Sequence, residues 1–308
     1  MIGTTDVQSF ATTRAARGAA CRLCGAPEPR LLHSFSTVSV DQCSTCGFVH
    51  VREQPREAEL VEMYGPDYFD RGKYSDPVPL AKENARRMRL LDGCGLARGA
   101  RVLDAGCATG DFIAFAGDGY EMWGMDISEF AVEEARRKTP AAASRIRTGL
   151  VEDRAYPSGY FDAIVLWDVL EHLWDPVTTL RLLLESLRPG GYFIVSTPNI
   201  GAPVARMMGK RWAFMTVPEH LGLFSRGTIT RLLEARLHLQ CVRWMTKGKW
   251  VNAGFLTYKL RRVFPRLVPA MLVHWMRTGW FRRVSLYVPT GDIQYCVARK
   301  ASATIEHP

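Results

Sequence analysis

The sequence predicts an α/β fold, a doubly wound and mostly parallel sheet, with a small cysteine-rich ribbon in front of it. Two observations predict the sheet. A buried strand stops at a glycine-rich turn within Arg101–Gly110, and after that turn apolar strands alternate with helical segments. Two Cys-x-x-Cys pairs near the N-terminus predict the ribbon. The chain has 308 residues, which is long enough for one large domain and a small module.

The ribbon is predicted from the spacing of four cysteines, Cys21, Cys24, Cys43 and Cys46. Two thiolates on each of two tight turns are the usual ligands of a tetrahedral Zn²⁺, and a disulfide pair is the alternative. Because no ligand position is left open, we expect a structural zinc. We expect the other four cysteines to be ordinary small residues of a protein in a reducing compartment; they are Cys94, Cys107, Cys241 and Cys296.

The formal net charge of +9 is concentrated in one stretch. Residues 235–291 hold eleven Lys and Arg and no Asp or Glu, so subtracting these eleven charges leaves −2 for the rest of the chain. No apolar run reaches the roughly 18 residues of a membrane span. The N-terminus lacks the apolar core of a signal peptide. We therefore expect a cytoplasmic protein, with attachment to the membrane surface as a further hypothesis.

The predicted organisation has four parts. A mobile tail (1–18) precedes the ribbon (19–52), and connecting helices with an aromatic flap (53–98) lead to the main domain (99–308). Helices are expected at Glu57–Tyr64 and Lys82–Ala97. The aromatic segment Tyr64–Phe69 suits either packing between the modules or a flap over a ligand. The main domain is predicted to carry two insertions, 199–224 and 248–289.

The glycine-rich turn has the pattern Asp-x-Gly-x-x-x-Gly, with Asp104, Gly106 and Gly110, and a helix is expected at Asp111–Ala116. The glycines allow a tight turn and close approach of a ligand to the backbone. A carboxylate beside the turn disfavours a pyrophosphate and suits a cation, such as the sulfonium and amino group of S-adenosylmethionine (SAM). By itself, the turn could also be purely structural.

In the rest of the main domain, predicted strands and helices alternate along the chain. Asp126, twenty residues after Gly106, stands where a carboxylate accepts from both ribose hydroxyls. Ser128 is a helix N-cap. The further strands are expected at Tyr120–Asp126, Ser144–Thr148, Tyr160–Trp167, Tyr192–Ser196, near Leu239–Thr246 and at Asp292–Arg299, with helices at Glu129–Lys138 and Pro176–Leu187.

With these motifs, roughly residues 80–299 resemble class I SAM-dependent methyltransferases. The motifs that carry the resemblance are Leu103-Asp-Ala-Gly-Cys-Ala-Thr-Gly110, Gly124-Met-Asp126, Phe161-Asp-Ala-Ile-Val165, Asp168-Val-Leu-Glu-His-Leu173 and Leu187-Arg-Pro-Gly-Gly191. The chain is also similar to members with an N-terminal zinc ribbon and a Pro-Glu-His-Leu sequence after the fifth strand. Its Asp168-x-x-Glu171-His172 pattern is similar to polyprenyl-quinone O-methyltransferases, in which the equivalent cluster is associated with a divalent metal.

The resemblance implies a seven-stranded sheet with an antiparallel last strand, and SAM as cofactor. It also implies positions for the cofactor. Asp104 and Gly106 would face the methionine part, and Trp167 would line the methyl-transfer face together with Asp168. The other residues implied to bind SAM are Cys107, Gly110, Asp126, Ile127, Leu150 and Val151, the last two beside the adenine.

Three side chains are candidates for the chemistry: His172, His220 and Asp168. Methyl transfer to a hydroxyl needs alignment and a base. His172 follows the fourth strand, where the rim of the active site lies, and His220 lies in the insertion 199–224, from which it could point at the acceptor. Purely structural roles for both histidines are the alternative. A second metal site, for Mg²⁺ or Zn²⁺, would use Asp168, Glu171 and His172 on one helical face.

The basic insertion, 248–289, mixes cations with aromatic side chains, and a helix is expected from Pro269 with Met271 and Trp275 on one face. This surface suits an anionic acceptor or an anionic bilayer. We favour a SAM-dependent O-methyltransferase of a small-molecule, glycan or lipid-linked acceptor in a biosynthetic pathway. The alternatives are an RNA methyltransferase that docks through the ribbon, which we rank lower, a C- or N-methyltransferase, and a SAM-binding protein without turnover.

Overall fold

The computed structural model describes residues 20–54, 77–252, 254, 256–257, 261, 267–277 and 285–302. The predicted tail, the helix expected at Glu57–Tyr64, the aromatic flap and part of the basic insertion lie outside these residues. The division into four parts stays a prediction.

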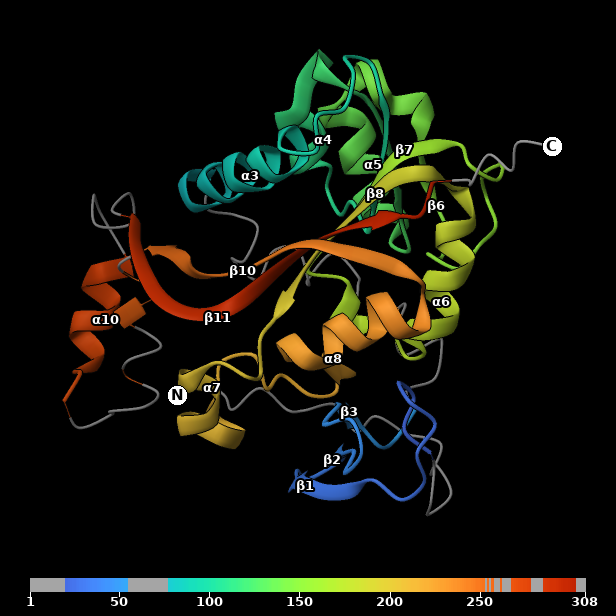
Figure 1. Ribbon diagram of the computed structural model, residues 1–308. Coiled ribbons are helices and arrows are strands. Elements are labelled where there is room, and N and C mark those ends of the chain that lie inside the picture. Colours follow the sequence, from blue (N-terminus) through green and yellow to red (C-terminus); the bar gives the residue numbers. More distant parts are fainter. Residues whose placement is uncertain are drawn as a thin grey trace.

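The main sheet has seven strands and the predicted arrangement (Figure 1). Only β11 is antiparallel to its neighbours, β8 and β10, and the other pairs of neighbouring strands are parallel. The mostly parallel sheet and the antiparallel last strand are therefore confirmed. In spatial order the strands are β10 (Leu239–Asn252), β11 (Ser285–Lys300), β8 (Leu187–Pro198), β7 (Phe161–Trp167), β4 (Arg101–Ala105), β5 (Glu121–Asp126) and β6 (Ile146–Thr148).

Helices cover both faces of this sheet, because alternate residues of each buried strand point to opposite faces. On β7, Ala163 and Val165 pack into the cluster formed with α3, α4 and α5, whereas Ile164 and Leu166 pack with α6 and α8. The helices are α3 (Pro77–Asp92), α4 (Asp111–Ala116), α5 (Glu129–Lys138), α6 (Pro176–Leu183), α7 (Pro203–Met208), α8 (Arg226–Thr230) and α10 (Ala270–Arg277).

Short helical turns join these elements, and side chains cap several of the helices. The Ser128 side chain accepts from the backbone N–H of Ala131 at the start of α5, as predicted, and Ser225 forms a capping box with Thr228 at α8. The turns are η1 (Gly117–Gly119), η2 (Pro140–Arg145), η3 (Leu170–His172), η4 (Leu184–Ser186), η5 (Gly209–Arg211) and the π-helical η6 (Arg231–Arg236).

Several predicted boundaries are wrong. Helix α3 spans Pro77–Asp92 rather than 82–97, because Gly93 and Gly95 follow and Gly95 has a φ of 66°. Strand β8 has 12 residues instead of the predicted five, since Arg188–Gly191 continues the strand. Strands β10 and β11 extend into the basic insertion, so part of that insertion is a long antiparallel hairpin.

The ribbon forms a second sheet, which takes one strand from the first insertion. Its order is β1 (Arg30–Ser34), β2 (Ser39–Gln42), β3 (Val49–Val51) and β9 (Gly222–Leu223). Strand β9 pairs antiparallel with β3. The sequence did not predict that the insertion 199–224 completes the ribbon's sheet. We call this insertion the cover loop.

The cysteines outside the ribbon differ from the prediction in one respect. Cys94 and Cys107 are free thiols. Cys241 on β10 and Cys296 on β11 form a disulfide. They meet because Cys241 pairs with Ala298, which lies two residues from Cys296 on the same strand face.

Candidate active site and metal sites

The turn between β4 and α4 is held in a conformation that glycine favours. Gly106 and Gly110 have φ values of 82° and 75°, in the left-handed region. A Cβ at Gly106 would lie 2.3 Å from Cγ2 of Val169, and one at Gly110 would lie 2.8 Å from Cβ of Ala135. The glycines are therefore needed for packing against the loop after β7 and against α5, as well as for the turn itself.

Asp104 is buried at this turn, and one of its two carboxyl oxygens lacks a hydrogen-bond partner among the described residues. The residue is 1% exposed, and its Oδ1 has no hydrogen-bond partner among the described residues. Burial raises the pKa of Asp104 to about 7, the cation of Arg87 opposes this shift and Asp126 adds to it. A buried acceptor without a partner is costly, so the site fits a ligand that donates a hydrogen bond or carries positive charge.

Trp167 supplies a second unsatisfied group at the same edge of the sheet. It ends β7, the strand next to β4, and its indole Nε1 is buried without a hydrogen-bond partner among the described residues. Its ring contacts Phe112 edge to face, with the ring centroids 5.2 Å apart. A buried donor and a buried acceptor at the carboxyl ends of adjacent strands are the expected lining of a ligand site in such a sheet.

Asp126 ends β5 with its carboxylate held by the backbone. Its Oδ2 accepts from the N–H of Ala108 at 2.8 Å, and its Oδ1 accepts from the N–H of Ser128 at 3.0 Å. A carboxylate oxygen can accept more than one hydrogen bond, so both oxygens can also accept from a ribose. Ile127 lies in the same turn, between Asp126 and the N-cap of α5.

Leu150 and Val151 are half-buried in the turn after β6. The carboxylate of Asp153 accepts from the N–H of Leu150 at 2.9 Å, so it is turned toward its own backbone. Asp153 would have to give up this hydrogen bond before it could accept from the amino group of an adenine.

Cys107 is unsuited to act as a nucleophile. The residue is 5% exposed, and burial raises the pKa of its thiol, with the carboxylates of Asp126 and Asp104 adding to the shift. A reactive cysteine needs the opposite environment, one that favours the thiolate. Cys107 is therefore better suited to filling the turn than to attacking a substrate.

Asp168 is held by Arg87 and Ser196, and the sequence indicated neither contact. Arg87 of α3 donates through Nη2 to Oδ2 of Asp168 at 3.0 Å, and the hydroxyl of Ser196 donates to Oδ1 at 3.0 Å. The guanidinium of Arg87 also lies 5.4 Å from the centre of the Trp167 ring. Spacing alone could not reveal this contact, since Arg87 and Asp168 are 81 residues apart.

The predicted metal set Asp168, Glu171 and His172 is not the set that the structure brings together. One ligand atom each of Glu171, His172 and His220 lie within 4.8 Å of one another. Asp168 lies outside this group, because its φ of 58° takes it out of any helix and only Leu170–His172 is helical. We call Glu171, His172 and His220 the histidine cluster.

Backbone carbonyls fix the tautomers of both imidazoles in the cluster. Nδ1 of His172 lies 2.9 Å from the carbonyl oxygen of Glu219, and Nδ1 of His220 lies 2.7 Å from that of Phe214. A carbonyl oxygen only accepts, so each Nδ1 carries the proton and donates it. In the neutral rings Nε2 is therefore the basic nitrogen. The two ring centroids are 4.9 Å apart.

Glu171 anchors the cluster in the core. It is 1% exposed, and its Oε2 accepts from the hydroxyl of Thr197 on β8 at 2.9 Å. Its carbonyl oxygen accepts from the N–H of Leu221 at 2.7 Å, which ties the cover loop to η3. A buried carboxylate beside two imidazoles can orient them, stabilise a proton on them or share a cation with them.

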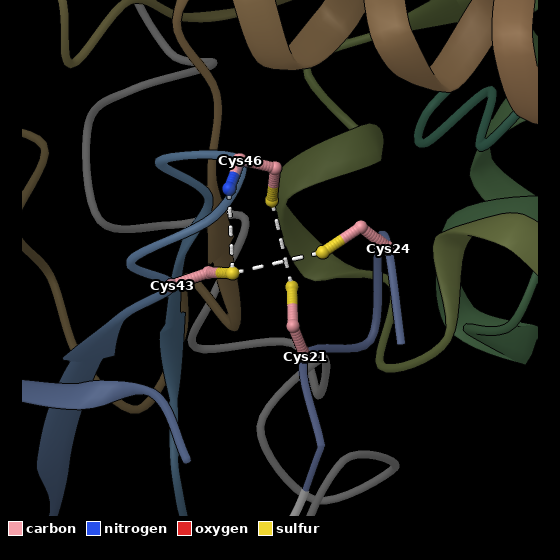
Figure 2. A group of neighbouring side chains, drawn as sticks. All are labelled: Cys21, Cys24, Cys43 and Cys46. Atoms are coloured by element: carbon pink, nitrogen blue, oxygen red, sulfur yellow. Dashed lines mark hydrogen bonds between the residues drawn. The ribbon is translucent and has the colours of Figure 1, made fainter. Parts of the chain in front are cut away.

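The four cysteines of the ribbon converge as their spacing predicts (Figure 2). The sulfur atoms of Cys21 and Cys46 are 3.6 Å apart, as are those of Cys24 and Cys43. With Zn–S bonds of about 2.3 Å, the sulfurs of a tetrahedral site lie about 3.8 Å apart, so the arrangement fits zinc. The residue after each pair is a glycine with positive φ, as in a knuckle turn.

Helix α10 presents large apolar side chains to the surface, on the face that the sequence predicts to carry Met271 and Trp275. Met271 is 82% exposed and Trp275 is 54% exposed, and Leu267 before the helix is 77% exposed. Val273 of the same helix is buried. Among the described residues, no helix combines the length and apolar character that crossing a bilayer would need.

The chain matches a known protein family over more than half of its length. The family profile described as a methyltransferase domain matches residues 71–236, more than half of the chain. A ubiquinone biosynthesis O-methyltransferase of Thiobacillus denitrificans is 33% identical over 132 residues, which are 42% of this chain and 57% of that protein. Its counterpart from Aromatoleum aromaticum is 34% identical over 178 residues, 56% of this chain and 75% of that protein.

A third relative is described as a probable S-adenosylmethionine-dependent methyltransferase of Mycolicibacterium smegmatis. It is 38% identical over 114 residues, 36% of this chain and 42% of that protein. The chain thus spans about half the length of the first curated relatives that it matches.

Solved structures share the fold at low sequence identity. Magnesium protoporphyrin IX methyltransferase of Synechocystis PCC 6803, solved with SAH bound, has a TM-score of 0.52 and 17% identity, covering 80% of this chain and all of that one. A Bacillus halodurans structure assigned as a methyltransferase also has a TM-score of 0.52, with 15% identity over 72% of this chain and all of that one. At these identities the likeness concerns the fold alone.

Proposed function

We propose that this chain, which belongs to the methyltransferase-domain family, transfers the methyl group of SAM to a hydroxyl oxygen of a small-molecule or lipid-linked acceptor. The observation that carries the proposal is the histidine cluster, at the same edge of the sheet as the buried Asp104. The names of two relatives, which are ubiquinone biosynthesis O-methyltransferases, support oxygen as the acceptor atom and a biosynthetic role.

The proposed cofactor site uses the turn after β4. Asp104 would accept from the amino group of SAM, and the buried, unpaired state of its Oδ1 supports this role. Asp126 would accept from the ribose hydroxyls. The other proposed contacts come from the turns and from the end of β7, and they are Gly106, Cys107, Gly110, Ile127, Leu150, Val151 and Trp167. In the ribbon, the four cysteines would hold a structural Zn²⁺.

The histidine cluster would remove the proton of the acceptor hydroxyl. SAM already activates the methyl carbon, so the protein has to align the acceptor and generate an oxygen nucleophile. A phenolic hydroxyl has a pKa of about 10, and an imidazole is a common general base for such a proton. Because Nδ1 of both His172 and His220 donates to a carbonyl oxygen, Nε2 is the nitrogen that would take the proton, and Asp168 would line the methyl-transfer face.

Substitution of the two histidines tests this role. His220→Gln and His172→Gln should each lower kcat by roughly 10²- to 10⁴-fold, because general bases contribute about that much. The affinity for SAM should change less than twofold, since neither residue belongs to the proposed cofactor site. His33→Gln, in the ribbon strand β1, is the control and should leave kcat unchanged. Normal turnover in both cluster variants would contradict the proposal.

The same cluster offers a second role, as a divalent metal site in which His220 replaces Asp168. Two imidazole nitrogens and a carboxylate oxygen suit Mg²⁺ or Zn²⁺. Turnover should be measured after dialysis against a chelator, with the ribbon zinc content followed separately. Full turnover with an intact ribbon would exclude the metal, and a loss that Mg²⁺ restores would favour it over base catalysis alone.

For the acceptor, we propose a molecule that reaches the protein from an anionic membrane surface. The support is the exposed apolar side of α10, with Met271 and Trp275, inside a stretch of the sequence that has eleven cations and no acidic residue. An apolar side chain beside lysine and arginine is the composition of segments that lie in an anionic lipid interface.

A further inference from the structure

We infer that the zinc ribbon positions His220, and that Arg22 is the positioning residue that connects the zinc knuckle to both histidine segments. This inference deepens the proposed function and rests on it, because the catalytic role of His220 is part of that proposal. It gives the ribbon a task in the active site in addition to its own folding.

The first observation is the shared sheet. Strand β3 of the ribbon pairs with β9 of the cover loop, through Val49 with Leu223 and His50 with Gly222. The N–H of Val51 also donates to the carbonyl oxygen of Leu221 at 3.0 Å. Leu221 is the residue next to His220, so the ribbon fixes the backbone on one side of this histidine.

The second observation is the set of hydrogen bonds made by Arg22. Its Nη2 donates to the carbonyl oxygens of Val51 at 2.7 Å and Leu221 at 3.0 Å, and its Nη1 donates to that of Trp174 at 3.0 Å. Its guanidinium also stacks 3.5 Å from the centre of the Trp174 ring. These three carbonyls belong to β3, to the cover loop beside His220, and to the segment two residues after His172.

Arginine suits this junction because its planar fork donates in several fixed directions at once. A lysine ammonium would keep the charge, but it cannot reach three carbonyls of three segments with the same geometry. Arg22 lies between Cys21 and Cys24, so the knuckle that the metal would close also sets the start of this side chain. The connection therefore runs from the four sulfurs through Arg22 to the two histidine segments.

The third observation is the packing beneath this junction. The rings of Phe48 in the ribbon and Phe224 after β9 are in contact, with their centroids 4.9 Å apart. A Cβ at Gly222 would lie 2.9 Å from Cζ of Phe48. Cys21 and Cys43 belong to the same buried cluster as Leu170 of η3. The ribbon thus has no separate core on this side, and a shift of the knuckle would move the support of the cover loop.

The test uses the full-length, zinc-loaded protein and three variants. Arg22→Lys removes the fork and keeps the charge. In Gly222→Ala, the added methyl group would push β9 away from Phe48 and would leave the four cysteines unchanged. This variant tests the same connection if Arg22→Lys folds poorly. Arg30→Gln is the matched control, because Arg30 is an arginine of the same ribbon whose side chain donates to that of Gln42 within the ribbon. For each, we would measure zinc content, SAM affinity, kcat and the ¹⁵N signals of the imidazoles.

We expect Arg22→Lys and Gly222→Ala to keep one zinc per chain and a SAM affinity within twofold of the wild type. The ¹⁵N signals of His220 should move from a pure Nδ1–H tautomer toward a mixture, and kcat should fall about 10- to 100-fold, as a small misplacement of a catalytic group does. Removal of zinc from the wild type should produce the same change in the signals of His220. Arg30→Gln should change none of these quantities.

Two outcomes separate this inference from the proposed function. Unchanged His220 signals in both variants and after zinc removal would overturn the positioning role, whatever happens to kcat. Altered signals together with an unchanged kcat would support the positioning role and overturn the catalytic role of His220.

Discussion

At the scale of single residues, the buried carboxyl of Asp104 is the most informative group in the cofactor site. Burial raises its pKa to about 7, although the cation of Arg87 lies close enough to lower it. Without ligand, this carboxyl is therefore largely protonated in mildly acidic solution. A cationic ligand needs the ionised form, so it should lower the pKa of Asp104 and displace the proton on binding.

The expected consequence is a pH-dependent SAM affinity. Below about pH 7 the affinity should fall about tenfold per pH unit, because each bound ligand must first displace one proton. From about pH 7 to 7.5 it should level off, before the amino group of SAM loses its own proton near pH 8. Calorimetric titrations between roughly pH 5.5 and 7.5 test this, with Asp104→Asn expected to bind weakly and without a pH slope. A pH-independent wild-type affinity would contradict the assignment.

Asp126 gives a second prediction at this scale. Asp126→Ala should weaken SAM binding by roughly 1.5–3 kcal/mol, the contribution of a charge-assisted hydrogen bond. Because Asp126 also accepts from the N–H groups of Ala108 and Ser128, a thermal melt must show that the turn is intact. Calorimetry that finds the wild-type affinity in a folded variant would contradict the ribose contact.

The residues that could be predicted from the sequence are those whose partners are close in the chain. Asp104, Gly106 and the four cysteines belong to local motifs, in which spacing alone determines the turn. Arg87 and Arg22 could not be predicted, because their partners come from elements 81 and as many as 199 residues away. For the same reason, Asp168 was predicted as a metal ligand in place of His220. The spacing of the sequence showed neither the contact of Asp168 with Arg87 nor the proximity of His220 to Glu171 and His172.

At the scale of elements, α10, the segment just before it and the start of β11 carry several exposed apolar side chains among the described residues; they are Leu267, Met271, Leu272, Trp275, Leu286 and Tyr287. Trp275 and Met271 would enter a lipid interface, and the neighbouring cations would meet anionic headgroups. The helix and its apolar positions could be predicted from the 3.6-residue period. Whether the apolar face turned inward or outward could not, because periodicity indicates a face and not its partner.

Vesicle co-sedimentation tests this surface. The wild type should bind vesicles with anionic lipid more strongly than neutral ones, and binding should weaken as salt rises. The double variant Met271→Glu, Trp275→Glu should lose most of this binding, because it puts two negative charges into the interface. Leu31→Glu, at a large exposed apolar residue of the ribbon, is the matched control. Equal binding of the wild type to both kinds of vesicle would contradict the proposed contact.

At the scale of the whole molecule, the ribbon, the cover loop and the main sheet form one continuous structure. The seven-stranded sheet was predictable, because its strands alternate with helices and its motifs have a family resemblance. The shared sheet of β3 and β9 was not, because β9 has two residues and no pattern of its own. Tertiary contact, more than local preference, determines where such a short strand forms.

The measurement that tests the central claim most directly is a single turnover with SAM labelled with ¹³C in its methyl group and a prenylated phenol as acceptor. NMR would follow the label while the amount of SAH is determined in parallel. We expect the label to move to the phenolic oxygen, with one SAH formed for each methyl ether. Transfer of the label to a carbon or nitrogen atom of the acceptor would contradict the proposed O-methylation.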